Sequence, residues 1–374
     1  MAPRRNLQIQ SVLDQQAVLS AFRENDIKEV HAWKLWSYIL RNVGSTWHDV
    51  PDFPVAAKQL LDSDFSMSTS HVVKSRTSKD GETTKLLIEL QDGMRVETVV
   101  MHYDTTGRET DDPVAIHGNR RATVCVSSQV GCQMGCKFCA TGTMGLMGNL
   151  TAGEIIEQLI HARDIDNFRN VVFMGMGEPL NNYDAVRQAV DMLTHSQVFG
   201  LSRKHVTIST VGVVQRLRDL AKDLPGVSLA FSLHAATQPL RRKIVPSASA
   251  YKLEDLMTAI DEYMACTQQK VFVEYVMLAG VNDSMEEAKN VGALLKGRNV
   301  TLNLIPFNPV YAEGVDFEPP SVQQVEKFQK LVHSCGVHCT IRQEKGQDIG
   351  GACGQLVVTP ANKNGLVDVE ELAA

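Results

Sequence analysis

Residues 131–139 read GCQMGCKFC and place Cys132, Cys136 and Cys139 at the spacing C-x3-C-x2-C, after a strand-like segment. Three thiolates leave one iron of a [4Fe-4S] cluster without a protein ligand. That open iron can bind S-adenosylmethionine through its amino and carboxylate groups. Electron transfer from the cluster then breaks a carbon–sulfur bond and releases a 5′-deoxyadenosyl radical. The spacing therefore favours a radical enzyme.

Two other interpretations of these cysteines stay open at this point. A zinc site would require a fourth Cys or His close by. The three side chains can also be ordinary buried residues that only fill a core. The cluster interpretation is preferred because the sequence that follows supplies the other parts of a radical enzyme.

The bulk composition is that of a globular protein with a sizeable core. The 374 residues are 44% hydrophobic, and 37 basic against 43 acidic residues give a formal net charge of −6. No stretch approaches the roughly 20 apolar residues that cross a bilayer, and the N-terminus lacks a signal-peptide apolar region. Eight cysteines in a chain of this length do not resemble a secreted disulfide framework. We therefore expect a cytoplasmic protein without a membrane segment.

Any RNA partner must be bound by local basic patches, because the overall charge is negative. Three candidate patches are residues 120–121, 203–205 and 241–243. Each of them alone is more typical of a solvated face than of an RNA contact.

The hydrophobic pattern divides the chain into four segments. Residues 1–68 predict a helical N-terminal accessory domain, because apolar residues recur at helical spacing. Residues 69–120 predict an antiparallel β segment and linker with two Asp-Gly turns. Residues 121–357 predict a barrel domain that ends in a loop around Cys353, and residues 358–374 a polar tail.

Strands and helices alternate for more than 200 residues of the third segment. The predicted strands cover residues 122–127, 170–176, 205–210, 227–233, 270–278 and 300–306. The predicted helices cover residues 151–164, 184–196, 214–223, 252–267, 284–297 and 321–335. Six βα units without a G-x-G-x-x-G after the first strand favour an α/β fold of the partial (β/α)6 barrel type over a doubly wound domain.

Reactive groups of such a barrel lie at the carboxyl ends of its strands. The run MGMGEPL, residues 174–180, lies at such a strand end. Its glycines let a ligand approach the backbone, and the carboxylate of Glu178 can bind an ammonium group. Further residues at strand ends are Ser209, Ser232, Leu233, His234 and Asn308. A single Ser or Asn at a strand end is more typical of a local backbone hydrogen bond, but together around one mouth these residues favour a binding site.

Two thiols outside the cluster motif complete a family pattern. Cys353 stands in the glycine-flanked run DIGGACGQL, residues 348–356, where a thiol is accessible. Cys125 precedes the first cluster cysteine by seven residues. The chain resembles the RlmN family of RNA methyltransferases and its antibiotic-resistance relative Cfr. The matching runs are VETV (96–99), CVSSQVGC (125–132), GMGEPL (175–180), SLH (232–234) and ACGQL (352–356).

The resemblance implies a radical S-adenosylmethionine barrel and a role for each motif residue. Cys132, Cys136 and Cys139 correspond to the ligands of the [4Fe-4S] cluster. The expected contacts of S-adenosylmethionine are Gly177, Glu178, Ser209, Ser232, Leu233, His234 and Asn308. Cys353 corresponds to the residue that is methylated first, Cys125 to the thiol that resolves a protein–RNA adduct by forming a disulfide, and Glu97 to a proton acceptor.

The implied reaction is methylation of adenosine C2 in large-subunit ribosomal RNA, with transfer RNA as a second candidate substrate. It implies an electron donor such as flavodoxin or ferredoxin, and we expect a monomer. One alternative is C8 methylation as in Cfr, which uses the same thiol pair. Another is a non-catalytic iron–sulfur RNA-binding protein, against which Cys125 and Cys353 argue because binding alone requires neither thiol.

Overall fold

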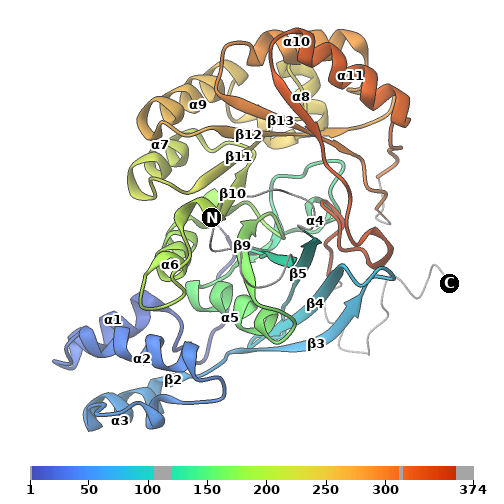
Figure 1. Ribbon diagram of the computed structural model, residues 1–374. Coiled ribbons are helices and arrows are strands. Elements are labelled where there is room, and N and C mark those ends of the chain that lie inside the picture. Colours follow the sequence, from blue (N-terminus) through green and yellow to red (C-terminus); the bar gives the residue numbers. More distant parts are fainter. Residues whose placement is uncertain (1, 105–119, 311–314, 359–374) are drawn as a thin grey trace.

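A mixed sheet of ten strands forms the centre of the computed structural model, which describes residues 2–104, 120–310 and 315–358. The strand order is β14-β13-β12-β11-β10-β9-β6-β5-β4-β3 (Figure 1). The outer strands β14 and β3 do not pair with each other, so the sheet curves without closing. The α/β partial barrel predicted from the sequence is confirmed.

Seven neighbouring strands of this sheet are parallel. They are β6 (Arg120–Cys125), β9 (Phe168–Phe173), β10 (Val206–Thr210), β11 (Ser228–Ser232), β12 (Val271–Met277), β13 (Val300–Pro306) and β14 (His338–Ile341). In β11 the consecutive residues Leu229, Ala230 and Phe231 are all fully buried. Such runs arise because helices cover one face of a parallel sheet while the other face lines the barrel interior.

The helices between these strands lie along the outside of the sheet (Figure 1). They are α5 (Ala152–Arg163), α6 (Tyr183–Thr194), α7 (Val214–Asp223), α8 (Gln238–Ile244), α9 (Leu253–Thr267), α10 (Met285–Leu295) and α11 (Val322–Ser334). Each of the six predicted βα units is present, with its strand and helix within a few residues of the predicted range. β14 was not among the predicted strands, because it has only four residues and two of them are exposed.

The antiparallel strands continue the parallel sheet rather than forming a separate one. β3 (Ser70–Thr77), β4 (Thr83–Leu90) and β5 (Arg95–Asp104) form a meander, and β5 pairs with β6. Both predicted Asp-Gly turns are present, with positive φ angles of 72° at Gly81 and 77° at Gly93. The division of the chain into domains stays a prediction, and the predicted polar tail from residue 359 onward lies outside the described residues.

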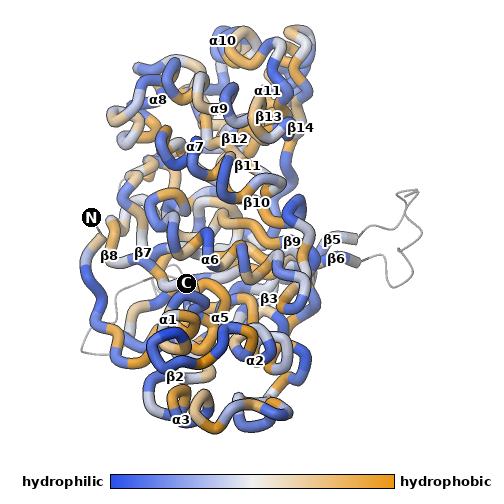
Figure 2. The backbone as a smooth tube through the Cα atoms, turned by 90° about the vertical axis from the view of Figure 1, so that its left-hand side faces the viewer, coloured by the Kyte–Doolittle hydropathy of each residue, from blue (hydrophilic) through white to orange (hydrophobic). Residues whose placement is uncertain are grey.

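A small hairpin stands apart from the main sheet and carries the three-cysteine motif. β7 (Gln129–Cys132) pairs with β8 (Gly145–Asn149), and the segment between them contains Cys136, Cys139 and the short helix α4 (Ala140–Thr143). Figure 2 shows this hairpin on one side of the molecule, and the end of β5 and the start of β6 on the opposite side. The carboxyl end of β6 therefore faces the cluster hairpin.

The N-terminal helices pack on one another and against the barrel helices. They are α1 (Gln15–Glu24), α2 (Val30–Arg41) and α3 (Val55–Asp64), with the two-residue strands β1 (Gln10–Ser11) and β2 (Phe65–Ser66) beside them. The buried indole of Trp36 donates a 2.8 Å hydrogen bond to the Val12 carbonyl. Among the described residues, none of the helices is long and apolar enough to cross a bilayer.

A buried carboxylate joins the N-terminal region to the barrel. Glu157 of α5 is 1% exposed and accepts hydrogen bonds from Ser11 Oγ at 2.6 Å and from Thr69 backbone N at 2.9 Å. The hydroxyls of Thr69 and Ser70 also donate to it. Because its donors come from distant parts of the chain, this one side chain fixes the start of the protein and the start of β3 on α5.

We expect Glu157→Ala to lower the free energy of unfolding by about 1 to 3 kcal/mol, because several buried donors lose their acceptor. Chemical denaturation followed by tryptophan fluorescence measures the change. Glu24→Gln at the exposed end of α1 is the matched control and should not alter stability. Equal stability of the two variants would show that Glu157 does not join these regions.

Candidate functional site

A cavity of about 150 Å³ lies at the carboxyl ends of the parallel strands. Most residues that the sequence singled out line it, although they come from separate βα units. These are Cys132, Cys136, Cys139, Gly177, Glu178, Ser209, Ser232, His234, Asn308 and Cys353. The structure therefore brings the three-cysteine motif and the strand-end residues to one place, which is called the first cavity below.

The cluster loop of residues 132–139 is held on two sides. Lys137 backbone N donates to the Ile244 carbonyl at 2.9 Å, and Ala140 N donates to the Gly354 carbonyl at 2.7 Å. Phe138 meets the imidazole of His234 edge-on, with ring centroids 4.7 Å apart. These contacts fix the loop between the end of α8 and the segment that carries Cys353.

The three thiols of the cluster loop are buried and lie close to one another. Burial raises the pKa of Cys132 to about 12, and the neighbouring thiols Cys139 and Cys132 both add to the raised pKa of Cys136. The three groups are therefore close enough to interact, and a bound cation would supply the charge that burial withholds.

Glu178 presents a buried carboxylate to the first cavity. Its Oε1 accepts from Leu180 N at 3.0 Å and its Oε2 from Val211 N at 2.9 Å. Burial is the largest influence on its pKa and raises it, while these hydrogen bonds act in the opposite direction. An ammonium group in the cavity would offset the cost of burying the carboxylate. Glu178 is therefore the residue here that can best orient an amino acid moiety.

Gly177 is required beside it for two reasons. Its φ is +98°, and a Cβ at this position would lie 2.6 Å from Cβ of Gln129. Gln129 Oε1 in turn accepts from Glu178 N at 2.9 Å. A side chain at position 177 would push this glutamine away from the turn that presents Glu178.

His234 is buried as a neutral imidazole. Desolvation, followed by the nearby Arg241 charge, lowers its pKa to about 3. Its Nδ1 accepts a 3.1 Å hydrogen bond from Val276 N, which requires the unprotonated nitrogen. Its φ of +59° is unusual for a residue other than glycine, and Asn282 fixes this turn by donating to the His234 carbonyl at 2.9 Å.

Leu233 and Arg241 are joined by a hydrogen bond, and of the two only Arg241 departs from what the sequence suggested. The Leu233 side chain lies in the main hydrophobic core, and its carbonyl accepts from Arg241 Nε at 3.1 Å. The Arg241 guanidinium also donates to the carbonyls of Val211 at 2.7 Å and Ser232 at 3.1 Å. Arg241 is 1% exposed, so the prediction that residues 241–243 form one basic surface patch is wrong. Only Arg242 and Lys243 face outward, because α8 turns the preceding side chain into the barrel.

A second cavity, of about 290 Å³, adjoins the first. Cys125 at the end of β6 and Cys353 both line it, together with Met174 and Asn308. Cys353 lines the first cavity as well. Asn308 Nδ2 donates to the Cys353 carbonyl at 3.0 Å, and its buried Oδ1 has no hydrogen-bond partner within the described residues. Cys353 is therefore held where a group on its sulfur can reach either cavity.

Cys125 is buried in the second cavity, whereas Cys353 is exposed. Burial, with a smaller contribution from Cys353, raises the pKa of Cys125 to about 12, whereas the Arg342 charge acts to lower it. Arg342, Tyr103 and Lys345 also line this cavity, and sequence reasoning missed all three. Arg342 could have been found had the short strand β14 been recognised, because it directly follows that strand's last residue.

Glu97 lies outside the lining of both cavities. Its Oε1 pairs with Lys85 Nζ at 2.9 Å, and its Oε2 accepts from Val357 N at 2.9 Å. Burial raises its pKa, and the Lys85 charge opposes that shift. In this structure Glu97 thus holds the chain four residues beyond Cys353.

Comparisons with known proteins agree with this site. A family model described as the Radical SAM superfamily matches residues 126–291. The chain is 42% identical over 315 residues to the ribosomal RNA large subunit methyltransferase N of Nitrosopumilus maritimus, which covers 83% of this chain and 87% of that relative. It is 38% identical over 328 residues to the dual-specificity RNA methyltransferase RlmN of a Sulfurovum species, covering 86% of this chain and 90% of the relative.

A solved structure extends the agreement to three dimensions. The crystal structure of a radical SAM methyltransferase from Sphaerobacter thermophilus matches this fold with a TM-score of 0.82 at 34% identity. The match covers 93% of this chain and 99% of that chain. It therefore includes the N-terminal helices as well as the barrel.

We expect Arg241→Ala to destabilise the protein by about 1 to 3 kcal/mol, because the buried carbonyl of Leu233 and the partly buried carbonyls of two further residues lose a charged donor. Arg242→Ala, at the next and exposed position, should leave stability unchanged. Thermal unfolding of the two variants makes the comparison. If both behave alike, the Arg241 guanidinium does not hold the strand ends together.

Proposed function

Because the chain belongs to the RlmN family of radical S-adenosylmethionine RNA methyltransferases, we propose that it methylates carbon 2 of an adenine in large-subunit ribosomal RNA. We include transfer RNA as a second substrate, since one relative is named a dual-specificity RNA methyltransferase. The need for an outside electron donor such as flavodoxin or ferredoxin, and a monomeric state, belong to the same proposal.

The observation that carries the proposal is the position of Cys353 between two cavities. The first cavity contains the three cluster-motif cysteines and Glu178, and the second contains Cys125. A thiol that lines both can receive a methyl group on one side and deliver it on the other. A simple methyl transfer to a nucleophilic atom would require no such intermediate carrier, and binding alone would require neither thiol.

The residues of the first cavity suit the group that the family uses. A [4Fe-4S] cluster with bound S-adenosylmethionine supplies a 5′-deoxyadenosyl radical. Cys132, Cys136 and Cys139 would hold the cluster, and Glu178 would hold the ammonium group of S-adenosylmethionine. The remaining predicted contacts are Gly177, Ser209, Ser232, Leu233, His234 and Asn308. Of these, Leu233 would act through its backbone, because its side chain is in the core.

Adenine C2 is an sp² carbon without useful nucleophilicity, so a covalent route suits it better than direct displacement. Cys353 first takes a methyl group from one S-adenosylmethionine, forming a thioether. That S-methyl group would then give one hydrogen atom to the 5′-deoxyadenosyl radical, and its carbon would bond to adenine C2. The resulting radical adduct would pass one electron to a one-electron acceptor such as the oxidised cluster and would give the C2 proton to a base, for which Cys125 and Glu97 are the candidates. Asn308 keeps the Cys353 backbone in place during these steps.

Cys125 is proposed to release the product. Its thiolate attacks the Cys353 sulfur, so a sulfur–sulfur bond forms and the bond from that sulfur to the methylene carbon breaks. The electron pair passes to the carbon, which takes up a proton and becomes the methyl group. Because burial raises the pKa of Cys125, the resting group is a thiol. We assign Arg342 the role of favouring the thiolate, since its charge lowers that pKa.

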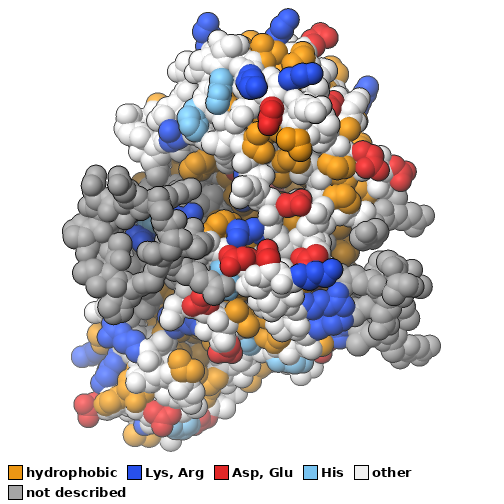
Figure 3. Space-filling model, turned by 45° about the vertical axis from the view of Figure 1, so that its right-hand side comes forward, with side chains coloured by type: hydrophobic (Ala, Val, Ile, Leu, Met, Phe, Trp, Pro, Cys, Tyr) orange, Lys and Arg blue, Asp and Glu red, His pale blue; other side chains and the backbone are white. Residues whose placement is uncertain are grey.

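RNA is proposed to enter through the second cavity, whose lining includes Arg342 and Lys345. Basic and acidic side chains are interspersed over the face shown in Figure 3. RNA binding would therefore depend on a few local cations rather than on a uniformly positive surface. Glu97 would serve this reaction by holding Val357 and the Cys353 loop, and its proposed role as proton acceptor would require this hydrogen bond to open.

We expect purified protein kept under anaerobic conditions to contain about four irons per chain, because three cysteines are sufficient for a site-differentiated cluster. Ala replacements of Cys132, Cys136 or Cys139 should each remove the iron. Cys266→Ala at an exposed position is the control and should retain it. Iron analysis of the purified variants measures the loss. Full activity with zinc in place of iron would contradict the assignment of these cysteines as cluster ligands.

Alanine variants of Cys353 and Cys125 should lose activity in different ways. Cys353→Ala removes the methyl-carrying sulfur, so neither an RNA adduct nor methylated RNA should form. Cys125→Ala keeps that sulfur but removes the resolving thiol, so a covalent protein–RNA complex should accumulate. Denaturing electrophoresis before and after nuclease treatment detects the complex. Normal turnover by folded, iron-containing Cys125→Ala would refute the mechanism, and nucleoside mass spectrometry against C2- and C8-methyladenosine standards tests the position.

A further inference from the structure

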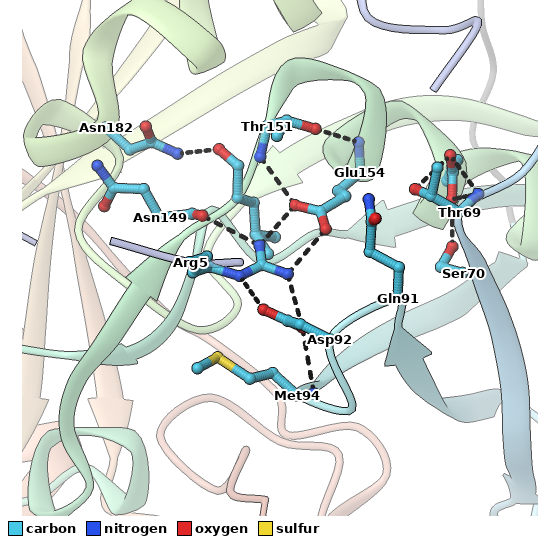
Figure 4. Close-up of polar contacts among 12 residues, drawn as sticks. Arg5, Thr69, Ser70, Gln91, Asp92, Met94, Asn149, Thr151, Glu154 and Asn182 are labelled. Carbon is cyan, nitrogen blue, oxygen red and sulfur yellow. Dashed lines mark hydrogen bonds and ion pairs between the residues drawn. The ribbon is translucent and has the colours of Figure 1, made fainter. Parts of the chain in front are cut away.

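An arginine near the start of the chain is buried against the base of the cluster hairpin. Arg5 donates to both oxygens of Asp92 at 2.7 and 2.9 Å and to both oxygens of Glu154 at 2.6 and 2.9 Å. A fifth hydrogen bond, of 3.1 Å, reaches the Asn149 carbonyl (Figure 4). The Arg5 side chain is only 3% exposed. This use of the whole guanidinium fork cannot be reproduced by a lysine.

The partners of Arg5 belong to three different elements. Asp92 lies in the turn between β4 and β5, Glu154 in the first turn of α5, and Asn149 at the end of β8. Glu154 also accepts from Thr151 N at 2.9 Å, as part of the capping box of α5. Arg5 thus connects the antiparallel strands, the first barrel helix and the cluster hairpin at a single point.

Position 148 leaves room for this side chain. A Cβ built on Gly148 would lie 2.5 Å from Cδ of Arg5 and 2.7 Å from its Cγ. The φ of Gly148 is outside the left-handed region, so backbone conformation does not demand glycine here. Glycine is needed at position 148 because Arg5 occupies the space that a side chain there would fill. A long side chain at position 148 would start along the course that Arg5 now follows.

Hydrogen bonds lead from this point into the first cavity. The Asn149 side chain accepts from Gln129 Nε2 at 2.7 Å, and Gln129 Oε1 accepts from Glu178 N at 2.9 Å. Asn182, at the end of the short helical turn that follows Glu178, donates to the Leu150 carbonyl at 2.8 Å. The base of the hairpin and the segment that presents Glu178 are therefore parts of one hydrogen-bonded unit.

We propose that Arg5 is a positioning residue of the active site, which fixes the base of the β7–β8 hairpin so that Glu178 and Cys132 keep their relative placement. This inference rests on the proposed binding of S-adenosylmethionine at Glu178. A residue that only stabilised the fold would change the melting temperature without changing ligand affinity. A positioning residue changes the affinity of protein that is folded and loaded with iron.

The test compares anaerobically reconstituted wild type with Arg5→Ala, Arg5→Lys and the double variant Arg5→Ala/Gly148→Arg. The control is Arg4→Ala, because Arg4 is the exposed neighbour. Equilibrium dialysis measures the dissociation constant for S-adenosylmethionine, and iron content and melting temperature are measured on the same samples. We expect Arg5→Ala to weaken binding by about tenfold at unchanged iron content, the scale on which outer-shell substitutions act.

The other variants show whether the effect belongs to the guanidinium. Arg5→Lys should be intermediate, because it keeps the charge and loses the fork. The double variant should recover most of the affinity, because an arginine at position 148 can reach the same two carboxylates. Arg4→Ala should bind as wild type does.

Unchanged affinity in Arg5→Ala, with or without a lower melting temperature, would overturn the inference. If Arg5→Ala does not fold, Arg5→Lys is measured instead. Wild-type affinity for S-adenosylmethionine in Arg5→Lys would then overturn the inference. Failure of the proposed function would look different, because wild-type protein with its iron would then not bind S-adenosylmethionine at all.

Discussion

The first cavity depends on one buried guanidinium. Strands β10 and β11 are paired neighbours in the sheet and end beside each other at this cavity. Arg241 donates to the carbonyls of Val211, Ser232 and Leu233 and thereby satisfies groups that would otherwise be buried without a donor. Burial, with a smaller contribution from the same charge, lowers the pKa of His234 and keeps that imidazole neutral and able to accept from Val276 N. Arg241 thus acts both on the polar contacts and on the protonation state at this edge.

The two cavities differ in their lining. The first is bounded by the cluster loop and the strand ends, where the buried Glu178 carboxylate can meet a charged ligand. The second adds Tyr103 and Lys345 to the Arg342 that both cavities share, and such aromatic and cationic groups can contact a nucleobase and its phosphates. The partial barrel permits this arrangement because β14 and β3 do not pair, so the sheet has an open side. A closed barrel would offer only its mouth to both ligands.

Sequence reasoning located most of this site because parallel strands bring their carboxyl ends to one edge. Residues such as Glu178, Ser209 and Asn308 could be placed together from the order of βα units alone. It failed for Arg241, since three consecutive basic residues read as surface and only the phase of a short helix turns the first one inward. β14 was missed because a four-residue strand with exposed ends carries little pattern. The contacts of Arg5 could not be foreseen, because they join positions more than 80 residues apart.

The segment that carries Cys353 is held at that residue and at the residues that follow it. Asn308 holds the carbonyl of Cys353 itself, Thr141 Oγ1 donates to the Leu356 carbonyl at 2.5 Å, and Glu97 accepts from Val357 N. The sulfur can therefore move mainly by rotation about its own side-chain bond. In the proposed mechanism the disulfide between Cys353 and Cys125 closes within one chain, so dissolved thiols are not needed to form it. Each turnover would leave the pair oxidised, and a dithiol reductant from outside would have to return both sulfurs to thiols before the next one.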